Sequence, residues 1–163
     1  FHQPSREQQR LAEVRHPVAA RIGDRFRPAV TLADCGRFII EPDGAVIRAR
    51  LIGDLARSLN ARMLHPSIAY LTTDAPVTTP FGASFEIEAD LPLDLRTIKR
   101  ELASRGIGTL EIKKRGVDID PAVFRTKLGL RGPESAVLIL TRIGDRRRAL
   151  VARRLIDESQ QGS

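Results

Sequence analysis

"SAVLILTRIGDRRRALVARR", residues 135–154, is the stretch that decides the fold. Its first half is a continuous apolar run, which is typical of a strand buried on both faces. Gly144 and Asp145 then give a two-residue turn signal, and the chain returns as a run with an apolar centre and arginines at both ends. The stretch therefore predicts a β-hairpin with a buried first strand.

The segment "LEIKKRGVDIDP", residues 110–121, combines a strand pattern with a cluster of positive charges. Leu110 and Ile112 fall on one face of the predicted strand, so Glu111 and Lys113 are expected to face outward. The remaining two cations of the cluster fall at the strand exit, beside a glycine that lets another backbone approach closely. This exit and the hairpin, if they lie at the same edge of the sheet, would form one basic groove.

Two helices are predicted from their start and stop signals. Asp94 is expected to cap a helix that ends at Gly106, with three residues in its buried stripe: Leu95, Ile98 and Leu102. The outer face of this helix carries four cations: Arg96, Lys99, Arg100 and Arg105. Asp120 followed by Pro121 predicts a second, short helix through Leu128.

The part of the chain before residue 94 contains the other predicted elements. "FIIEPDG" is a short apolar run closed by turn residues. Residues 45–59 are expected to form one amphipathic helix, because four apolar residues recur at helical spacing: Ile47, Leu51, Leu55 and Leu59. "SIAYLTTD" and "TPFGASFEIEAD" read as two strands, and "LPLD" as the connector to the next helix.

In this order the elements predict an α/β (α+β) domain, a mixed sheet with helices packed against it. We expect this domain to occupy residues 37–155. Residues 1–36 read as a polar leader or linker, with the remnant of an upstream domain as one interpretation, and residues 156–163 as a polar tail.

The chain has 163 residues and a net charge of +7, and this charge is concentrated in one part of it. Residues 110–155 contain twelve Lys or Arg and five Asp or Glu, so they carry the whole excess. A localised basic region attracts polyanions, and nucleic acid is the first candidate. The sequence shows neither a transmembrane run nor a signal-peptide pattern, which predicts a soluble, cytoplasmic protein without a membrane partner.

Several kinds of active site are not indicated. His2, His16 and His65 have no second ligand at metal-site spacing, so no metal site is expected. "GIGTL" contains a GxG that follows a helix and leads into a strand, the reverse of the order in a dinucleotide or S-adenosylmethionine pocket. Cys35 is interpreted as a small packed hydrophobe rather than a nucleophile. We therefore expect neither a catalytic residue nor a cofactor in this chain.

Five segments in a fixed order carry a resemblance to a known family: "GRFIIEPDGAVIRARLIGDLA", "IAYLTTD", "TPF", "LEIKKRGVDIDP" and "LILTRIGDRRRALVARR". They resemble the THUMP-like domain found at the C-terminus of a group of bacterial, especially actinobacterial, class I S-adenosylmethionine-dependent methyltransferases. The likeness extends from Gly36 to Arg154. It implies a module that recognises RNA and is joined, on its N-terminal side, to a Rossmann-type catalytic domain.

Residues 1–36 contain neither a glycine-rich loop nor the Asn/Asp-Pro-Pro-aromatic motif of such a catalytic domain. The resemblance thus implies that S-adenosylmethionine binds only in an upstream domain, acting in cis or in trans, and we expect this chain alone to be non-catalytic. The implied partner is a structured RNA, tRNA or rRNA. The expected RNA-binding residues are Lys113, Lys114, Arg115, Arg142, Arg146, Arg147 and Arg148.

Two other readings stay open. The basic residues could be only a solubilising surface, in a protein-interaction module that docks a separate methyltransferase through the helix of residues 45–59 and the acidic strand "FEIEAD". An enzyme in its own right would need a carboxylate pair such as Asp118 with Glu111. If the chain binds RNA, the scarcity of exposed aromatic residues favours recognition by charge and shape over base stacking.

Overall fold

The computed structural model describes residues 35–157, which form one seven-stranded sheet in the order β2-β3-β1-β4-β7-β6-β5. All neighbouring strands are antiparallel except β5 and β6, which are parallel. The strands are β1 (Phe38–Pro42), β2 (Arg62–His65), β3 (Ile68–Thr73), β4 (Gly82–Pro92), β5 (Ile107–Lys114), β6 (Glu134–Ile143) and β7 (Arg146–Arg154).

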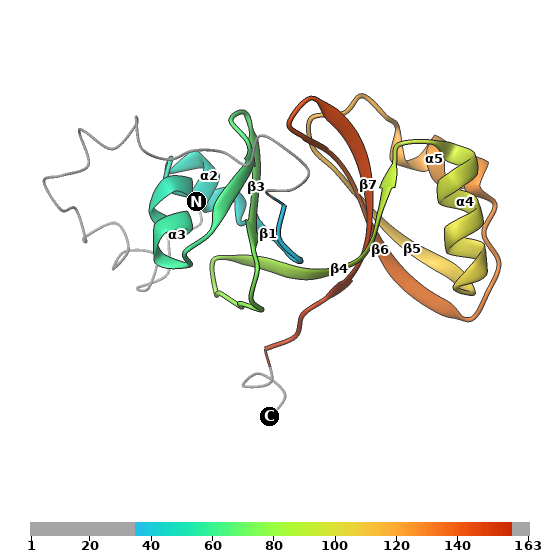
Figure 1. Ribbon diagram of the computed structural model, residues 1–163, viewed down its shortest axis with the longest axis horizontal. Helices are drawn as coiled ribbons and strands as arrows, with labels where there is room; N and C mark the ends of the chain where they lie inside the picture. Colours follow the sequence, from blue (N-terminus) through green and yellow to red (C-terminus); the bar gives the residue numbers. More distant parts are fainter. Residues whose placement is uncertain (1–34, 158–163) are drawn as a thin grey trace, which may run out of the picture.

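The helices of the described part cover the sheet at its two ends (Figure 1). They are α2 (Gly44–Arg48), α3 (Ile52–Ser58), α4 (Leu95–Ser104) and α5 (Pro121–Leu128). The first two pack beside β1 and β3, whereas α4 and α5 pack beside β5, β6 and β7. The prediction of a mixed sheet with helices packed against it is confirmed.

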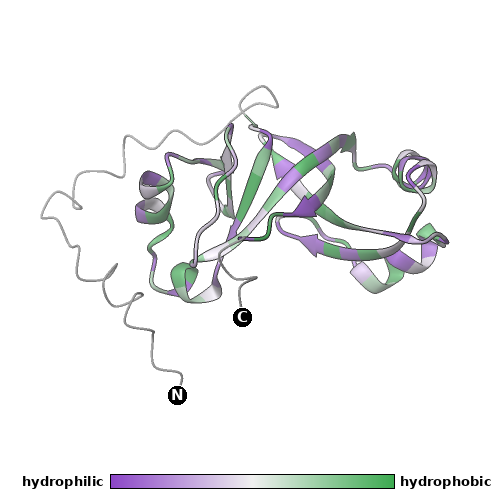
Figure 2. Ribbon diagram, turned by 90° about the horizontal axis from the view of Figure 1, so that it is seen from below, coloured by the Kyte–Doolittle hydropathy of each residue, from purple (hydrophilic) through white to green (hydrophobic). Residues whose placement is uncertain are grey.

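The sheet curls so that one of its faces closes on itself. Leu64 and Tyr70, from β2 and β3, share a core with Ile139 and Ile143 of β6 and with Leu150 of β7. These strands are not neighbours in the sheet, so only curvature can bring their side chains together. We call this face the concave side and the face covered by α4 and α5 the helix side. Hydrophobic and hydrophilic residues alternate along the strands accordingly (Figure 2).

A β-bulge allows β4 to serve both sides of the sheet. The register with β7 shifts between Ile87 and Ala89. Ile87 therefore packs against the concave core, as Phe85 does, whereas Ala89 and Leu91 pack against the helix-side core. Without a bulge, strict alternation would place all four side chains on one face of the sheet. The extra residue of the bulge reverses the pleat, so the last two side chains face the other side.

The expectation of one helix over residues 45–59 is wrong, because the structure contains α2 and α3 in its place. Arg50 interrupts them with a left-handed φ of 58°. Val46 and Leu55 both belong to the core under β1 and β3. Nine residues apart, they would lie on opposite faces of a continuous helix at 100° per residue. The break between the two helices turns both side chains toward the same core.

The remaining elements agree with the expected ones, with two exceptions. β2 was not predicted, and β4 extends through Pro92, which had been assigned to a connector. The predicted caps are present: Asp94 accepts a hydrogen bond from Thr97 N at 2.8 Å, and Asp120 accepts one from Ala122 N at 2.9 Å. Within residues 35–157, no helix has the length and apolar character needed to cross a membrane.

Candidate nucleic-acid interface

The two basic segments lie at the same end of the sheet. β5 runs parallel to β6, with Lys114 opposite Leu140, and the β6–β7 turn follows a few residues further on. Arg142 and Arg147 face each other directly across this hairpin. The C-terminal ends of β5 and β6 and the start of β7 therefore bring together the seven residues predicted as RNA contacts.

The pleat of the sheet divides these seven residues between its two faces. Alternation places Lys114, Arg142 and Arg147 on the helix side, which they share with Leu110, Leu140 and Ala149. We call these three the helix-side cations. The other four fall on the concave side of their strands or of the strand exit: Lys113, Arg115, Arg146 and Arg148.

Lys113 does not face outward into solvent, as the sequence led us to expect. Its side chain is only 19% exposed, and its Nζ lies 3.2 Å from Glu41 Oε1 and 3.3 Å from Glu111 Oε1. The ammonium also lies 5.6 Å from the ring centre of Phe85. The outward expectation was wrong because the curled sheet brings β1 over the concave side of β5. Lys113 is therefore a structural cation rather than a free contact.

The ion pairs of Lys113 belong to a larger network on the concave side. Tyr70 OH donates to Glu41 Oε2 at 3.2 Å, and the guanidinium of Arg115 lies 5.6 Å from the Tyr70 ring centre. Burial, together with the charge of Glu41, raises the pKa of Tyr70 well above its ordinary value. The phenol therefore remains a neutral donor at physiological pH. The network joins β1, β3 and β5 and so helps to close the curled sheet.

Arg154 extends the network to β7. Its Nη2 donates to Glu111 Oε1 at 3.2 Å, and its guanidinium lies 4.9 Å from the Phe85 ring centre. Partial burial acts to raise the pKa of Glu111, but the hydrogen bonds and charges of Lys113 and Arg154 outweigh it and hold the pKa below its ordinary value. An ionised, paired Glu111 is a poor candidate for the acid of a carboxylate pair with Asp118.

Arg148 is also neutralised. Its Nε donates to Asp90 Oδ1 at 2.8 Å, and its side chain is 15% exposed. Lys114, Arg146 and Arg147 differ, because they are exposed and have no carboxylate partner among the described residues. Of the predicted cations, these three are both exposed and without a carboxylate partner in the described part.

Arg142 combines partial burial with an incomplete set of hydrogen bonds. Its Nε is inaccessible to solvent and has no hydrogen-bond partner in the described part of the chain. The side chain runs beside Gly116, where an added Cβ would lie 3.8 Å from Arg142 Cδ. Arg142 lies directly opposite Arg147, on the strand next to that of Lys114. Buried donors are normally satisfied, so the Nε of Arg142 is expected to bind water or a ligand atom.

The two surfaces considered for docking a partner protein, residues 45–59 and the strand "FEIEAD", make contacts within the domain itself. The apolar residues of α2 and α3, such as Val46 and Leu55, are buried against β1 and β3. In the strand "FEIEAD", Glu86 pairs with Arg37 and Arg153, and Glu88 pairs with Arg105. Neither surface offers the free apolar or acidic groups that docking through them would require.

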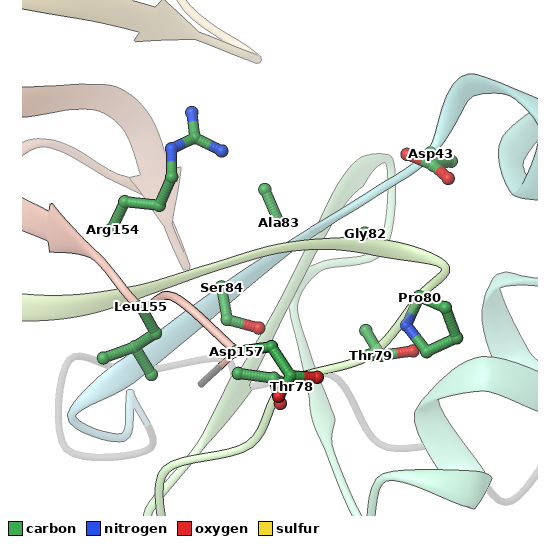
Figure 3. A pocket seen from close by; sticks show the side chains of 10 residues that line it. All are labelled: Asp43, Thr78, Thr79, Pro80, Gly82, Ala83, Ser84, Arg154, Leu155 and Asp157. Carbon is green, nitrogen blue, oxygen red and sulfur yellow. The ribbon is translucent and has the colours of Figure 1, made fainter. Parts of the chain in front are cut away.

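A polar pocket of about 420 Å³ lies at the far end of β7 from this basic cluster (Figure 3). It is lined by Asp43, Thr78, Thr79, Pro80, Gly82, Ala83, Ser84, Arg154, Leu155 and Asp157. Its one cationic group, Arg154, is already paired with Glu111.

Cys35, the predicted packed cysteine, contacts the concave core, and burial raises its pKa to about 11. The thiol is therefore protonated and weakly nucleophilic at neutral pH.

The fold agrees with the comparisons to known proteins. Residues 82–154 match the family described as "THUMP domain-like". Two relatives, from two strains of Mycobacterium tuberculosis, are each described as an uncharacterized S-adenosylmethionine-dependent methyltransferase. Each is 37% identical over 123 residues, which cover 76% of this chain and 34% of the relative.

A crystal structure from Porphyromonas gingivalis, described as a "putative methyltransferase", contains a region with a similar fold. It matches with a TM-score of 0.66 and 21% identity, over 80% of this chain and 32% of that one. The chain therefore contains a THUMP-like domain, and the predicted resemblance is confirmed. It spans about a third of the length of the curated relatives, which are methyltransferases by name.

Proposed function

We propose that this chain binds structured RNA, tRNA or rRNA, as the substrate-recognition part of a cytoplasmic S-adenosylmethionine-dependent methyltransferase. The catalytic domain would act in cis or in trans, and the cofactor would bind there rather than in this chain. The observation that carries the proposal is the meeting of Lys114, Arg142 and Arg147 at one end of the sheet, on neighbouring strands and without carboxylate partners in the described part.

The way in which RNA would be held follows from the side chains available. Phosphates attract Lys and Arg without regard to sequence, and their neutralisation releases counterions. Base stacking would require exposed aromatic rings, but in the described part Tyr70 and Phe85 are fully buried and Phe38 is 6% exposed. Phe81 and Phe124 are partly buried and pack against the cores under the helices. Recognition through the RNA backbone and its shape is therefore favoured.

The test is binding of the full 163-residue chain to total tRNA and to a generic duplex over a salt series. We expect a preference for tRNA and a steep salt dependence. Changing Lys114→Gln, Arg146→Gln and Arg147→Gln together should weaken binding and flatten the slope by about 0.7–0.9 per lost phosphate contact.

A matched control removes exposed cations from the other end of the strands β5 to β7. Lys127→Gln with Arg131→Gln changes exposed cations at the end of α5 and after it, before β6 begins. This control should leave binding unchanged. Equal, weak binding to every nucleic acid, insensitive to both sets of changes, would overturn the proposal and favour a protein partner.

A further inference from the structure

The first half of α4 lies at the same end of the sheet as the helix-side cations, although the sequence separates them. β4 ends at Pro92, which pairs with Arg148 at the start of β7, and α4 begins three residues after Pro92. The start of α4 and the β6–β7 turn therefore lie at the same end of the sheet (Figure 1). Ile98 and Leu102 fix α4 to the helix side, because they share its core with Leu140 and Ala149.

The cations of α4 fall into two classes. Arg105, just after the helix, is neutralised: its Nε donates to Glu101 Oε1 at 2.7 Å, and its Nη1 lies 3.4 Å from Glu88 Oε2. The first half of the helix carries three exposed cations that form no salt bridge in the described part of the chain, although the charges of the two arginines help to lower the pKa of the capping Asp94: Arg96, Lys99 and Arg100. The free charge of α4 is thus concentrated at the end nearest the β6–β7 turn.

The carboxylates at this end do not offset that charge fully. Asp94 and Asp120 are used as helix caps, and Asp90 is paired with Arg148. Asp118 and Asp145 are exposed and are the two acidic residues of the β5 exit and the β6–β7 turn that have no such role. The excess of free cations therefore continues from the strands onto the helix.

We propose that the RNA-binding surface extends over the helix side of the sheet end to Arg96, Lys99 and Arg100 of α4, and that its ligand is a double-helical RNA segment. This inference rests on the proposed function and adds the face, the residues and the RNA conformation. On the concave side, Lys113 and Arg148 are neutralised by Glu41, Glu111 and Asp90, which leaves Arg115 and Arg146 there. The helix side, with Lys114, Arg142, Arg147 and the three cations of α4, therefore carries more of the unpaired positive charge.

The cations of this surface lie on two rigid elements, the sheet end and α4. The strands from β5 to β7 cover about 10 Å, at about 4.8 Å per strand, and Arg96 to Arg100 adds about 6 Å along the axis of α4. Cations placed on two rigid elements can contact phosphates of both strands on either side of a groove. An unpaired strand would instead need rings on which its bases could stack, and Tyr70 and Phe85 are not accessible.

The experiment compares a double-stranded RNA with a single-stranded RNA of the same composition, using the full chain and fluorescence anisotropy over several salt concentrations. The key variant is Arg96→Gln, Lys99→Gln and Arg100→Gln combined; all three side chains are exposed and Gln preserves helix propensity. Lys127→Gln with Arg131→Gln is the matched control, and circular dichroism verifies that each variant is folded.

We expect the α4 variant to lose at least about tenfold in duplex affinity, to show a flatter salt slope, and to change single-strand binding less. If the wild type binds no RNA, the proposed function itself fails. If the wild type binds and the Lys114, Arg146 and Arg147 variant is weakened while the α4 variant is not, the extension onto α4 is wrong. An equal loss for single-stranded and double-stranded RNA would overturn the assignment of the duplex.

Discussion

Lys113 and Lys114 are neighbours in sequence, but they leave β5 on opposite faces and meet different environments. Lys113 lies between Glu41 and Glu111, whereas Lys114 is exposed. A run of three cations looks uniform in the sequence. The pleat makes one of them part of the fold and leaves the next one available to a ligand.

Replacing each lysine by Met should therefore have opposite consequences. Lys113→Met leaves two carboxylates close together without their cation, and we expect it to lower the free energy of unfolding by about 1–3 kcal/mol with little effect on RNA affinity. Lys114→Met should leave stability nearly unchanged and weaken RNA binding. Urea denaturation and anisotropy titrations measure the two effects. Similar behaviour of both variants would contradict the assignment of the two faces.

The lowered pKa of Glu111 predicts how the stability of the fold depends on pH. Its pKa in the folded protein lies below the ordinary value, because Lys113 and Arg154 lower it against the opposing effect of burial. A carboxyl group whose pKa is lowered by folding stabilises the folded state at pH values above its ordinary pKa. That stabilisation is lost as the pH falls through the pKa of the folded state. The stability difference between the wild type and Glu111→Gln should therefore shrink on acidification below about pH 4.5, as urea titrations at successive pH values would show.

At the scale of the element, the path of the chain after β5 depends on Gly116. Gly116 has a φ of 74°, and an added Cβ would lie 2.9 Å from Ile68 Cγ1 and collide with the end of that side chain. This close approach brings the strand exit against the start of β3. The glycine therefore lets the basic strand end and the β2–β3 hairpin meet.

Gly116→Ala should destabilise the protein by about 1–3 kcal/mol, because it combines backbone strain with overpacking against Ile68. Gly129→Ala is the control: its φ is 53°, but its Cβ would find open space apart from Thr126 O at 3.8 Å. We expect the Gly129 change to cost about 1 kcal/mol through backbone strain alone. Thermal and urea unfolding would compare the two, and an equal loss would mean that the contact with Ile68 contributes nothing.

Elements with strong local signals were predicted well. α4 and α5 have their caps at Asp94 and Asp120, and the β6–β7 hairpin turns at Gly144. The helix of residues 45–59 was not predicted correctly, because its break at Arg50 serves a core that is assembled from distant strands. The bulge in β4 was missed for the same reason.

At the scale of the whole molecule, the concave core links the two ends of the sheet. Phe85 of β4 is fully buried there, in the same core as Tyr70 of β3 and Ile139 of β6. Its ring also lies under the charged groups of Lys113 and Arg154. The two helix-covered ends should therefore unfold as one cooperative unit.

Phe85→Ala should cost about 3–5 kcal/mol, because it opens a cavity at this junction. Hydrogen exchange should show lower protection in both β1–β3 and β5–β7. Phe81→Ala is the control, since Phe81 packs only against the core beneath α2 and α3, and its effect should stay near that core. Loss of protection at one end alone in the Phe85 variant would show that the ends are independent.

The sequence by itself determined the class of fold, the position of the basic charge in residues 110–155, and the local starts and ends of α4, α5 and the β6–β7 hairpin. Those features rest on periodicity, capping and turn chemistry, which act over a few neighbouring residues. Only the tertiary structure decided that Lys113 is neutralised by Glu41, 72 residues away, while the start of α4 lies at the same end of the sheet as Lys114 and Arg147. Curvature and register set these distances, and both arise from packing between strands that are remote in the chain.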